Sequence, residues 1–290
     1  YIYSFLKLTF FQKVFIFKFL MIFKKILNII HKIKSQIFYR LISFKIFIRR
    51  KFPYLYKILY IFWWQHVVRI IWLFKCKPKG VLVYVGLNKG ISFANIHYKY
   101  ELAIGYEANP ELFKDLTKKF KSFKNVKIFN FAASDKNSEE NFYISDNQDM
   151  VSSSLSKFSK KLKQKIGYKK IIKVKTINLG EHLQDLNINY IDEYLSDAQG
   201  YDLTILKSLE KFIINNKIEK ITCEVTRNFK NNIYFEADNY EKSFEAFLPN
   251  QYKKVAIGES KLKEGEFQIV PDYYNSYDVM WINQIKYKTK

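Results

Sequence analysis

The sequence predicts an α/β fold in which a mostly parallel sheet carries helices on both faces. Short apolar runs alternate with helical stretches from residue 80 onward, as in "GVLVYVG" (80–86) and "LAIGYE" (102–107). A glycine turn follows the first run, and an acid, Glu107, ends the second. Strands and helices that alternate at this spacing build parallel sheets, and ligands bind beyond the carboxyl ends of such strands. The residues that end each strand are therefore the candidate site.

The first half of this domain has a signal for each element. The apolar run 80–86 is expected to be a buried strand, and residues 88–98 a short helix. Residues 109–123 should form a helix, because Asn109 can cap it, Pro110 suits its first turn and apolar side chains recur at helical spacing. Further strands are expected at 102–107, 125–134 and 140–145.

The second half begins with a Ser- and Lys-rich stretch, residues 149–165, which is predicted to be a loop or a mobile lid. A helix is expected at 201–216, directly after a strand that ends in an acid and a glycine. The strands predicted here are 170–179, 190–200, 218–225 and a final alternating strand at 277–287.

Positive charge is concentrated at the N-terminus. The 290 residues carry a net charge of +22, but residues 1–80 hold 17 Lys and Arg and no acid, whereas the remainder holds 32 basic and 27 acidic residues. The chain therefore divides into a basic, aromatic-rich helical extension (1–79) and an ordinary domain (80–290). A nucleic-acid partner is not expected, because the domain itself is nearly neutral.

The basic extension does not predict a membrane-spanning helix. Its longest charge-free run, residues 58–68, is well short of the roughly 20 residues that a span needs. Two alternatives remain: peripheral binding to an anionic membrane surface through residues 21–78, or packing on the domain. Met21 begins a credible natural start, which makes residues 1–20 a candidate for upstream sequence that is not native. The expected location is cytoplasmic, with a peripheral position on the inner membrane face as the alternative.

Two cysteines, Cys76 and Cys223, lie far apart in the chain. Cys223 falls in an apolar run, so a buried free thiol is expected rather than a disulfide. The sequence shows no cluster of Cys and His with zinc spacing, and no metal is predicted.

The strand ends bring together residues that suit a nucleoside. Gly86 and Gly90 leave room for backbone N–H groups to approach a ligand. Glu107, 21 residues after Gly86, is placed to accept hydrogen bonds from both ribose hydroxyls. Ala132 and Ala133 are small enough to leave space for a flat adenine ring. Alternatively, the two glycines only form a turn between the strand and the helix and bind no ligand.

Six segments occur in the order and spacing of one family: "YVGLNKG", "GYEANPELF", "NFAAS", "SSSL", "TINL" and "IDEYLSDAQGYDLTILKSL…ITCEV". The chain therefore resembles the FkbM-type methyltransferases over about residues 80–284. This resemblance implies a Rossmann-like sheet, S-adenosylmethionine as the cofactor and a small-molecule or glycan acceptor. It also implies O-methylation of a hydroxyl on a sugar or glycan.

The match departs from the family pattern in three places. Tyr84 replaces the Asp of the first turn, and Leu87 replaces an Ala. Ala108 stands where the family has Pro after the acid. The later Lys and Glu of the family motif are replaced by Leu195 and Gln199. Tyr84 raises the question of whether the turn still holds the cofactor as tightly.

The resemblance assigns roles residue by residue. Asp197 is the candidate base and Gln199 would hydrogen-bond the acceptor or the cofactor; helix capping and a solvated loop are the corresponding structural interpretations. The cofactor-binding residues that it implies are Gly86, Asn88, Gly90, Glu107, Ala108, Ala132, Ala133 and Asp197.

Three further features lie near the predicted site or within it. Glu224 ends a strand and is either a ligand-binding residue or part of a surface salt bridge. His97 is predicted to lie on the surface at a helix end. The run Ser152–Ser154 either covers the cofactor or is a plain loop.

Two other functions compete with methyl transfer. An oxidoreductase that uses NAD is disfavoured, because the glycines are spaced G-x-x-x-G rather than G-x-G-x-x-G. A non-catalytic Rossmann-like protein, held at a membrane surface by the basic segment or bound to nucleic acid, is the second alternative.

Overall fold

The computed structural model describes residues 77–146, 150, 152–160, 164, 167–227, 234–235, 237–257, 260–261 and 276–287. The predicted basic extension therefore lies outside the described residues except for 77–79, and so does Cys76. Its membrane-surface binding and the location of the protein stay predictions.

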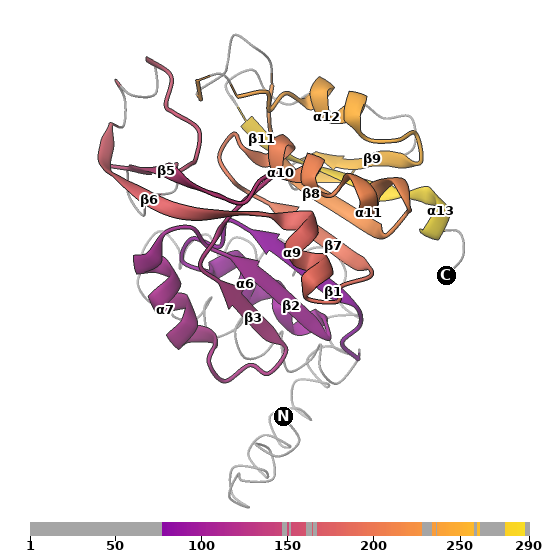
Figure 1. The fold of residues 1–290 in the computed structure, drawn as a ribbon. Coiled ribbons are helices and arrows are strands. Elements are labelled where there is room, and N and C mark those ends of the chain that lie inside the picture. The colour runs from indigo at the N-terminus through magenta and orange to yellow at the C-terminus, as the bar shows by residue number, and fades with distance from the viewer. Residues whose placement is uncertain are drawn as a thin grey trace, which may run out of the picture. The chain divides into compact units, whose positions relative to one another are not determined.

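The larger of two sheets has eight strands in the order β10-β9-β11-β8-β7-β1-β2-β3 (Figure 1). Five neighbouring strands, β8-β7-β1-β2-β3, are parallel, and β11, β9 and β10 extend the sheet antiparallel. The prediction of a mostly parallel sheet is confirmed. The strands are β1 (Val81–Val85), β2 (Leu102–Tyr106), β3 (Val126–Phe129), β7 (Ile191–Ser196), β8 (Ile218–Thr226), β9 (Tyr252–Ile257), β10 (Ser260–Lys261) and β11 (Ser276–Asn283).

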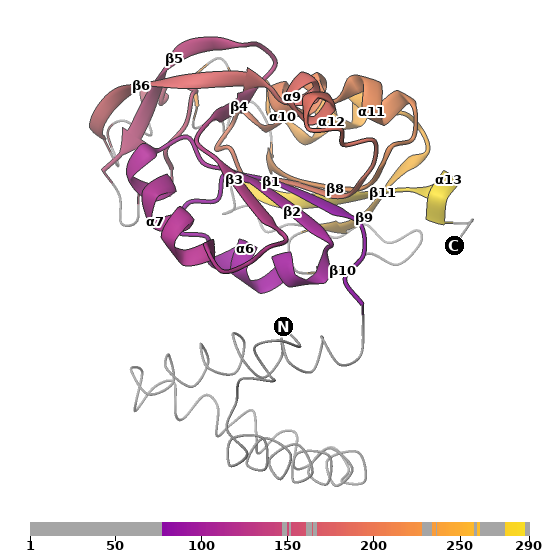
Figure 2. The same cartoon turned by 60° about the horizontal axis from the view of Figure 1, so that its bottom comes forward.

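Helices cover both faces of this sheet, as predicted (Figure 2). Helices α6 and α7 lie on one side, and α9, α10, α11 and α12 lie on the other. The helical segments are α6 (Ile91–Ile96), η2 (His97–Lys99), α7 (Pro110–Phe120), α9 (Leu179–Asp185), α10 (Asp202–Ser208), α11 (Glu210–Ile214), α12 (Glu241–Phe247) and α13 (Gln284–Tyr287).

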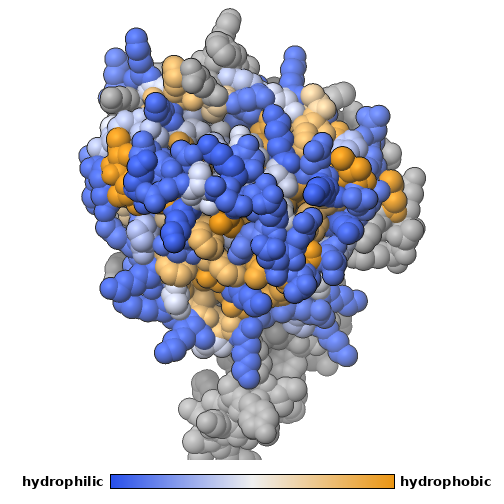
Figure 3. Space-filling view, in the orientation of Figure 1, coloured by the Kyte–Doolittle hydropathy of each residue, from blue (hydrophilic) through white to orange (hydrophobic). Residues whose placement is uncertain are grey.

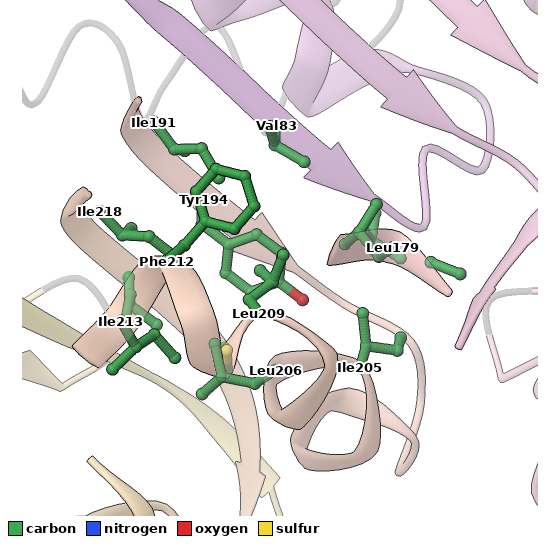
Figure 4. Close-up of a cluster of buried hydrophobic side chains, with 14 of the residues drawn as sticks. Val83, Leu179, Ile191, Tyr194, Ile205, Leu206, Leu209, Phe212, Ile213 and Ile218 are labelled. Atoms are coloured by element: carbon green, nitrogen blue, oxygen red, sulfur yellow. The ribbon is translucent and has the colours of Figure 1, made fainter. Parts of the chain in front are cut away.

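The period-2 pattern of β1 explains how both faces are buried. Val83 and Val85 join the core beneath α9 to α12, whereas Leu82 and Tyr84 join the core beneath α6 and α7. In the first core, Tyr194 of β7 packs with Leu206 and other apolar side chains of the helices above it (Figure 4). Both cores fix the central strands, and therefore the positions of the strand ends.

His97 is buried, and the prediction that it lies on the surface is wrong. It is 1% exposed and packs among the rings of Phe93, Phe120 and Phe123. The aromatic side chains of α6 and α7 converge on this helix end, and an imidazole fits between them. His97 thus belongs to the core on the α6 and α7 side.

A second sheet has three strands in the order β4-β6-β5. They are β4 (Ala132–Ser134), β6 (Tyr168–Asn178) and β5 (Ser138–Ser145). The prediction of a single strand over 125–134 is wrong, because β3 and β4 belong to different sheets. Asn130 separates them: its side-chain amide donates hydrogen bonds to the backbone oxygens of Glu107 and Ala108, at 2.8 and 3.2 Å.

Other boundaries also differ from prediction. The expected helix 201–216 is two helices, α10 and α11, that meet at Leu209. The sequence did not predict α9, α12 or β9. The N-terminus of α7 is as predicted, since the side chain of Asn109 accepts a hydrogen bond from the backbone N–H of Glu111.

The face of the molecule seen in Figure 3 is largely covered by hydrophilic side chains, with apolar atoms in scattered patches. Within the described part of the chain, no helix is long and apolar enough to cross a membrane.

Candidate active site

A cavity of about 240 Å³ opens at the carboxyl ends of β1, β2 and β7. Of the predicted site residues, all but Gly90 line it. Additional lining residues that the sequence did not single out include Phe131, Phe142, Met150, Leu155, Tyr201 and Ile205. Parallel sheets place their ligand sites at this edge, so the cavity lies where the fold predicts it.

The turn after β1 is held against both neighbouring strands. The backbone N–H groups of Gly86 and Leu87 donate to the backbone oxygen of Tyr106, at 3.1 and 3.2 Å. Gly86 has φ +80°, and a Cβ there would lie 2.1 Å from the backbone oxygen of Asp197. Only glycine permits this close approach. Asn88 also has positive φ, +48°, and it directs its N–H inward.

Gly90 serves packing rather than the cavity lining. It caps α6 with φ +66°, and an added Cβ would lie 2.5 Å from the Leu116 side chain of α7. The glycine therefore lets the turn sit close to α7. The ammonium group of Lys119 donates to the backbone oxygens of Lys89 and Gly90, at 2.9 and 3.2 Å, and ties the turn to the same helix.

Glu107 is a buried carboxylate at the end of β2, 5% exposed. Its Oε2 accepts from the backbone N–H of Asn88 at 2.7 Å, and its Oε1 accepts from that of Asn109 at 2.9 Å. Burial raises the pKa of Glu107 to about 7, although these two N–H groups lower it. Each oxygen retains further acceptor capacity.

Small residues flank the cavity beside Glu107. Ala108 follows the acid directly, and Ala132 and Ala133 are buried in β4. The side chains of Phe131 and Phe142 complete this apolar end. The alanines could be predicted because they end an apolar run. The two phenylalanines could not, since nothing in their local sequence separates them from core residues.

Asp197 lies just after β7, where the carboxyl end of the strand meets the cavity. Desolvation of the carboxyl group raises the pKa of Asp197 to about 6; the hydrogen bond from Gln199 lowers it, and the charge of Asp278 raises it by a smaller amount. Asp197 does not cap α10, whose N-cap residue is Tyr201. The structural interpretation of this aspartate is therefore wrong.

Gln199 is fully engaged rather than solvated. Its Nε2 donates to Asp197 Oδ1 at 2.5 Å and to Glu224 Oε2 at 3.1 Å, and its Oε1 accepts from the Tyr234 hydroxyl at 2.7 Å. The structure therefore places Gln199 between two carboxylates. Its amide is already bonded to the protein, which differs from the expected contact with an acceptor or cofactor.

Glu224 belongs to this cluster and forms no salt bridge within the described residues. Its Oε1 accepts from the Ser276 hydroxyl at 2.7 Å, and Asp278 is its cross-strand partner on β11. Burial, followed by the charges of Asp197 and Asp202, raises the pKa of Glu224 well above its ordinary value.

Asp202, which the sequence did not single out, holds the loop that carries Asp197. It is fully buried at the first residue of α10. It accepts a short hydrogen bond from the Ser196 hydroxyl and another from the backbone N–H of Ala198 at 2.8 Å. Burial raises the pKa of Asp202 to about 7.

Tyr84, which stands where the family has Asp, is packed and not ionised. It is buried beneath α6, with its ring edge-on to Phe93, and burial keeps the pKa of its phenol far above neutrality. Tyr84 therefore supports the turn by packing.

The run Ser152–Ser154 contributes to the site. Ser153 lines the cavity, and the Ser154 hydroxyl donates to the backbone oxygens of Ala198 and Gln199, at 3.2 and 2.8 Å. No group of three or more His, Cys, Asp or Glu side chains in the described residues is arranged to hold a metal ion.

The sheet, with helices on both faces and a cavity at the carboxyl ends of its parallel strands, is Rossmann-like. Residues 85–254 match the family described as the methyltransferase FkbM domain. The chain therefore belongs to the FkbM methyltransferase family, whose cofactor is S-adenosylmethionine. The predicted family and cofactor are confirmed.

The solved structures that resemble this chain are distant. An FkbM methyltransferase from Methylobacillus flagellatus KT shares 12% identity with a TM-score of 0.42; 70% of this chain and 43% of that chain are covered. This chain thus spans less than half of that relative. No curated protein matches the sequence significantly.

Two further structures show similar values. Fibrillarin from Aeropyrum pernix, in complex with S-adenosyl-L-methionine, shares 8% identity with a TM-score of 0.40, over 71% of this chain and 67% of that chain. An rRNA methylase from Streptococcus thermophilus shares 8% identity with a TM-score of 0.39, over 75% and 95%.

Proposed function

We propose that the chain transfers a methyl group from S-adenosylmethionine to a hydroxyl group of a sugar or glycan. The observation that carries this proposal is one cavity bordered by strand ends on both sides of β1. Glu107, which follows β2, lies on one side with small residues, and Asp197, which follows β7, lies on the other; these two sides are the cofactor end and the acceptor end. The family supplies the reaction class, and these two ends suit the cofactor and the acceptor.

The residues present fit the cofactor. Glu107 is buried and faces the cavity with acceptor capacity left on both oxygens, so two ribose hydroxyls could satisfy it. Such donors favour the charged form of the acid, which burial disfavours. Ala108, Ala132 and Ala133, with Phe131, would hold the adenine, and the turn at Gly86 and Asn88 would hold the methionine part.

When bound, S-adenosylmethionine supplies an electrophilic methyl group. This chain must then orient the acceptor and take its proton. Asp197 Oδ1 is fixed by Gln199, whereas Oδ2 receives no hydrogen bond from the described residues. Oδ2 is thus the atom that would accept the hydroxyl proton as the acceptor oxygen is methylated. A pKa of about 6 leaves Asp197 mostly ionised at neutral pH and still basic enough to act.

The acceptor end carries hydrogen-bond acceptors. Asp197, just after β7, lines the cavity, and the carboxyl groups of Glu224 on β8 and Asp278 on β11 lie behind it. Hydroxyl groups donate to carboxylates, so a polyhydroxylated acceptor suits this end better than a phosphorylated one.

The test measures transfer of tritium from S-adenosyl-[methyl-³H]methionine to a panel of monosaccharides, oligosaccharides and an RNA control. Asp197→Asn keeps the size of the side chain and removes the base. We expect it to bind S-adenosylmethionine within about twofold of wild type and to lose about 10²–10⁴-fold in turnover.

Asp115→Asn on the exposed face of α7 is the matched control and should retain wild-type turnover. The assignment of Asp197 fails if Asp197→Asn keeps more than about a tenth of the wild-type rate. Transfer to RNA with none to saccharides would instead overturn the acceptor class.

A further inference from the structure

Gln199 has an unusual backbone conformation at the acceptor end of the cavity. Its φ is +54°, in the left-handed region that residues with side chains rarely adopt. Strained residues persist only where their surroundings hold them, and they gather at functional sites. The groups that hold Gln199 are therefore candidates for a role in the reaction.

The backbone of Gln199 is held by Ser154. The Ser154 hydroxyl, buried at 1% exposure, donates to the backbone oxygens of Ala198 and Gln199. Ser154 is itself fixed by two backbone hydrogen bonds to Tyr143 of β5, at 2.9 and 3.1 Å. The second sheet thus supports the loop that follows β7.

The side chain of Gln199 is held by Tyr234. The amide NH₂ group must face Asp197, because an ionised carboxylate only accepts hydrogen bonds; the same NH₂ group lies 3.1 Å from Glu224 Oε2. The amide oxygen must then face a donor, and the Tyr234 hydroxyl supplies one at 2.7 Å. A flipped amide would set its oxygen against the Asp197 carboxylate. Tyr234 therefore selects the orientation in which Gln199 donates to Asp197.

We propose that Tyr234 is a positioning residue for methyl transfer, which acts by fixing the Gln199 amide so that it holds the carboxylate of Asp197. This inference rests on the proposed function of Asp197. It assigns a role to a residue outside the cavity lining, in a segment 35 residues after Gln199. The hydroxyl, and not the ring, is the part that acts.

The ring of Tyr234 has a separate, structural contact set. It is 2% exposed and packs with Tyr143, Phe158 and Ala237, and it lies under Gly200, where an added Cβ would approach it within 2.5 Å. Phenylalanine would preserve this packing. Tyr234→Phe thus removes the hydroxyl alone.

Tyr168→Phe is the matched control. Tyr168 packs against the same cluster, and its hydroxyl accepts from the backbone N–H of Phe158 at 2.9 Å rather than from the site. Both variants lose one hydroxyl from one aromatic cluster, but only Tyr234→Phe disconnects Gln199.

The experiment measures the pKa of Asp197 by monitoring the NMR signals of ¹³C-labelled aspartate carboxyl carbons as the pH changes. The resonance of Asp197 is assigned by its loss in Asp197→Asn. A hydrogen bond to a carboxylate lowers its pKa, so a loosened Gln199 raises it. We expect the apparent pKa to rise by about half to one unit in Tyr234→Phe and to stay unchanged in Tyr168→Phe. The titratable groups that face Asp197 are Glu224, Asp278, Asp202, Tyr84 and Tyr234 itself. The four other than Tyr234 are the same in both proteins.

A second variant shows whether Tyr234 acts through Gln199. Gln199→Leu should raise the apparent pKa of Asp197 by about one unit or more, and adding Tyr234→Phe to it should change nothing further. The proposal is overturned if Tyr234→Phe titrates like wild type, if Tyr168→Phe shifts equally, or if Gln199→Leu has no effect. Should Tyr234→Phe not fold, Gln199→Leu alone decides whether the amide holds Asp197.

These titrations need neither cofactor nor acceptor. Failure of the proposed function would appear separately, as absence of S-adenosylmethionine binding by the wild-type protein in calorimetry. With an acceptor in hand, the acid limb of the rate profile should move with the NMR titration, while the affinity for S-adenosylmethionine stays within about twofold of wild type.

Discussion

Replacing Glu107 by Gln exchanges one carboxylate oxygen for an NH₂ group, which affects both the hydrogen bonds to the backbone and the proposed contact with the ribose. Both carboxylate oxygens accept backbone N–H groups, from Asn88 at 2.7 Å and from Asn109 at 2.9 Å. A glutamine amide has only one oxygen, so it can satisfy only one of these donors. Its NH₂ group must face the other N–H, in a site that is 5% exposed.

Two losses follow from this geometry. A buried donor left without an acceptor costs about 1–3 kcal/mol of folding stability. In the bound state, the ribose hydroxyls lose a charged acceptor, which costs about 1.5–3 kcal/mol of binding, or roughly ten- to hundredfold in affinity. Glu107→Gln should therefore lower the affinity for S-adenosylmethionine, whereas the lost acceptor and the removal of a buried charge act on the melting temperature in opposite directions.

Calorimetric titration with S-adenosylmethionine and thermal unfolding measure the two effects on one preparation. Glu101→Gln is the control, because Glu101 is exposed just before β2 and should leave both quantities unchanged. Wild-type affinity in Glu107→Gln would refute the assignment of Glu107 to the ribose, whatever the melting temperature does.

Three other predictions concern the fold. Burial raises the pKa values of Glu107 and Asp202 to about 7, above their unfolded values of about 4, so folding favours their protonated forms. The free energy of unfolding should therefore fall as pH rises from about 4 to about 7, and it should fall less steeply in Asp202→Asn. Urea unfolding that shows greater stability at pH 8 than at pH 5 would contradict this. Gly90→Ala should destabilise by about 1–3 kcal/mol more than Gly167→Ala, since both have left-handed φ but only the first Cβ meets α7; equal urea midpoints would show that packing at Gly90 is irrelevant. Cys223 is a fully buried free thiol whose pKa is raised by burial. Ellman's reagent should therefore modify this thiol only after the protein is unfolded, as detected by mass spectrometry of the peptide that contains it. Rapid labelling of the native protein would disprove its burial.

Strand ends could be predicted from the sequence because their signals are local. An apolar run that stops at a glycine or an acid marks both a strand and its carboxyl end, as at Gly86, Glu107 and Asp197. The parallel arrangement then places these residues at one edge of the sheet. Their convergence on one cavity required no further information than the order of elements.

The residues that the sequence could not reveal depend on contacts between distant segments. Tyr234 reaches Gln199, and Asp202 reaches Ser196, only because separate elements meet behind the cavity. His97 looked like a surface residue because its burial depends on rings from α6, α7 and the segment after α7. Gly90 looked like a ligand-binding glycine, since a packing glycine and a binding glycine share the same local pattern.

The central claim is that the cofactor lies along the cavity with its ribose at Glu107 and its sulfur toward Asp197. A crystal structure of the protein with S-adenosylhomocysteine tests this most directly. The account predicts both ribose hydroxyls within hydrogen-bonding distance of the Glu107 carboxylate, the adenine between Ala108 and Phe131, and the sulfur at the Asp197 end. A nucleoside bound elsewhere, or bound here with its ribose away from Glu107, would contradict the account.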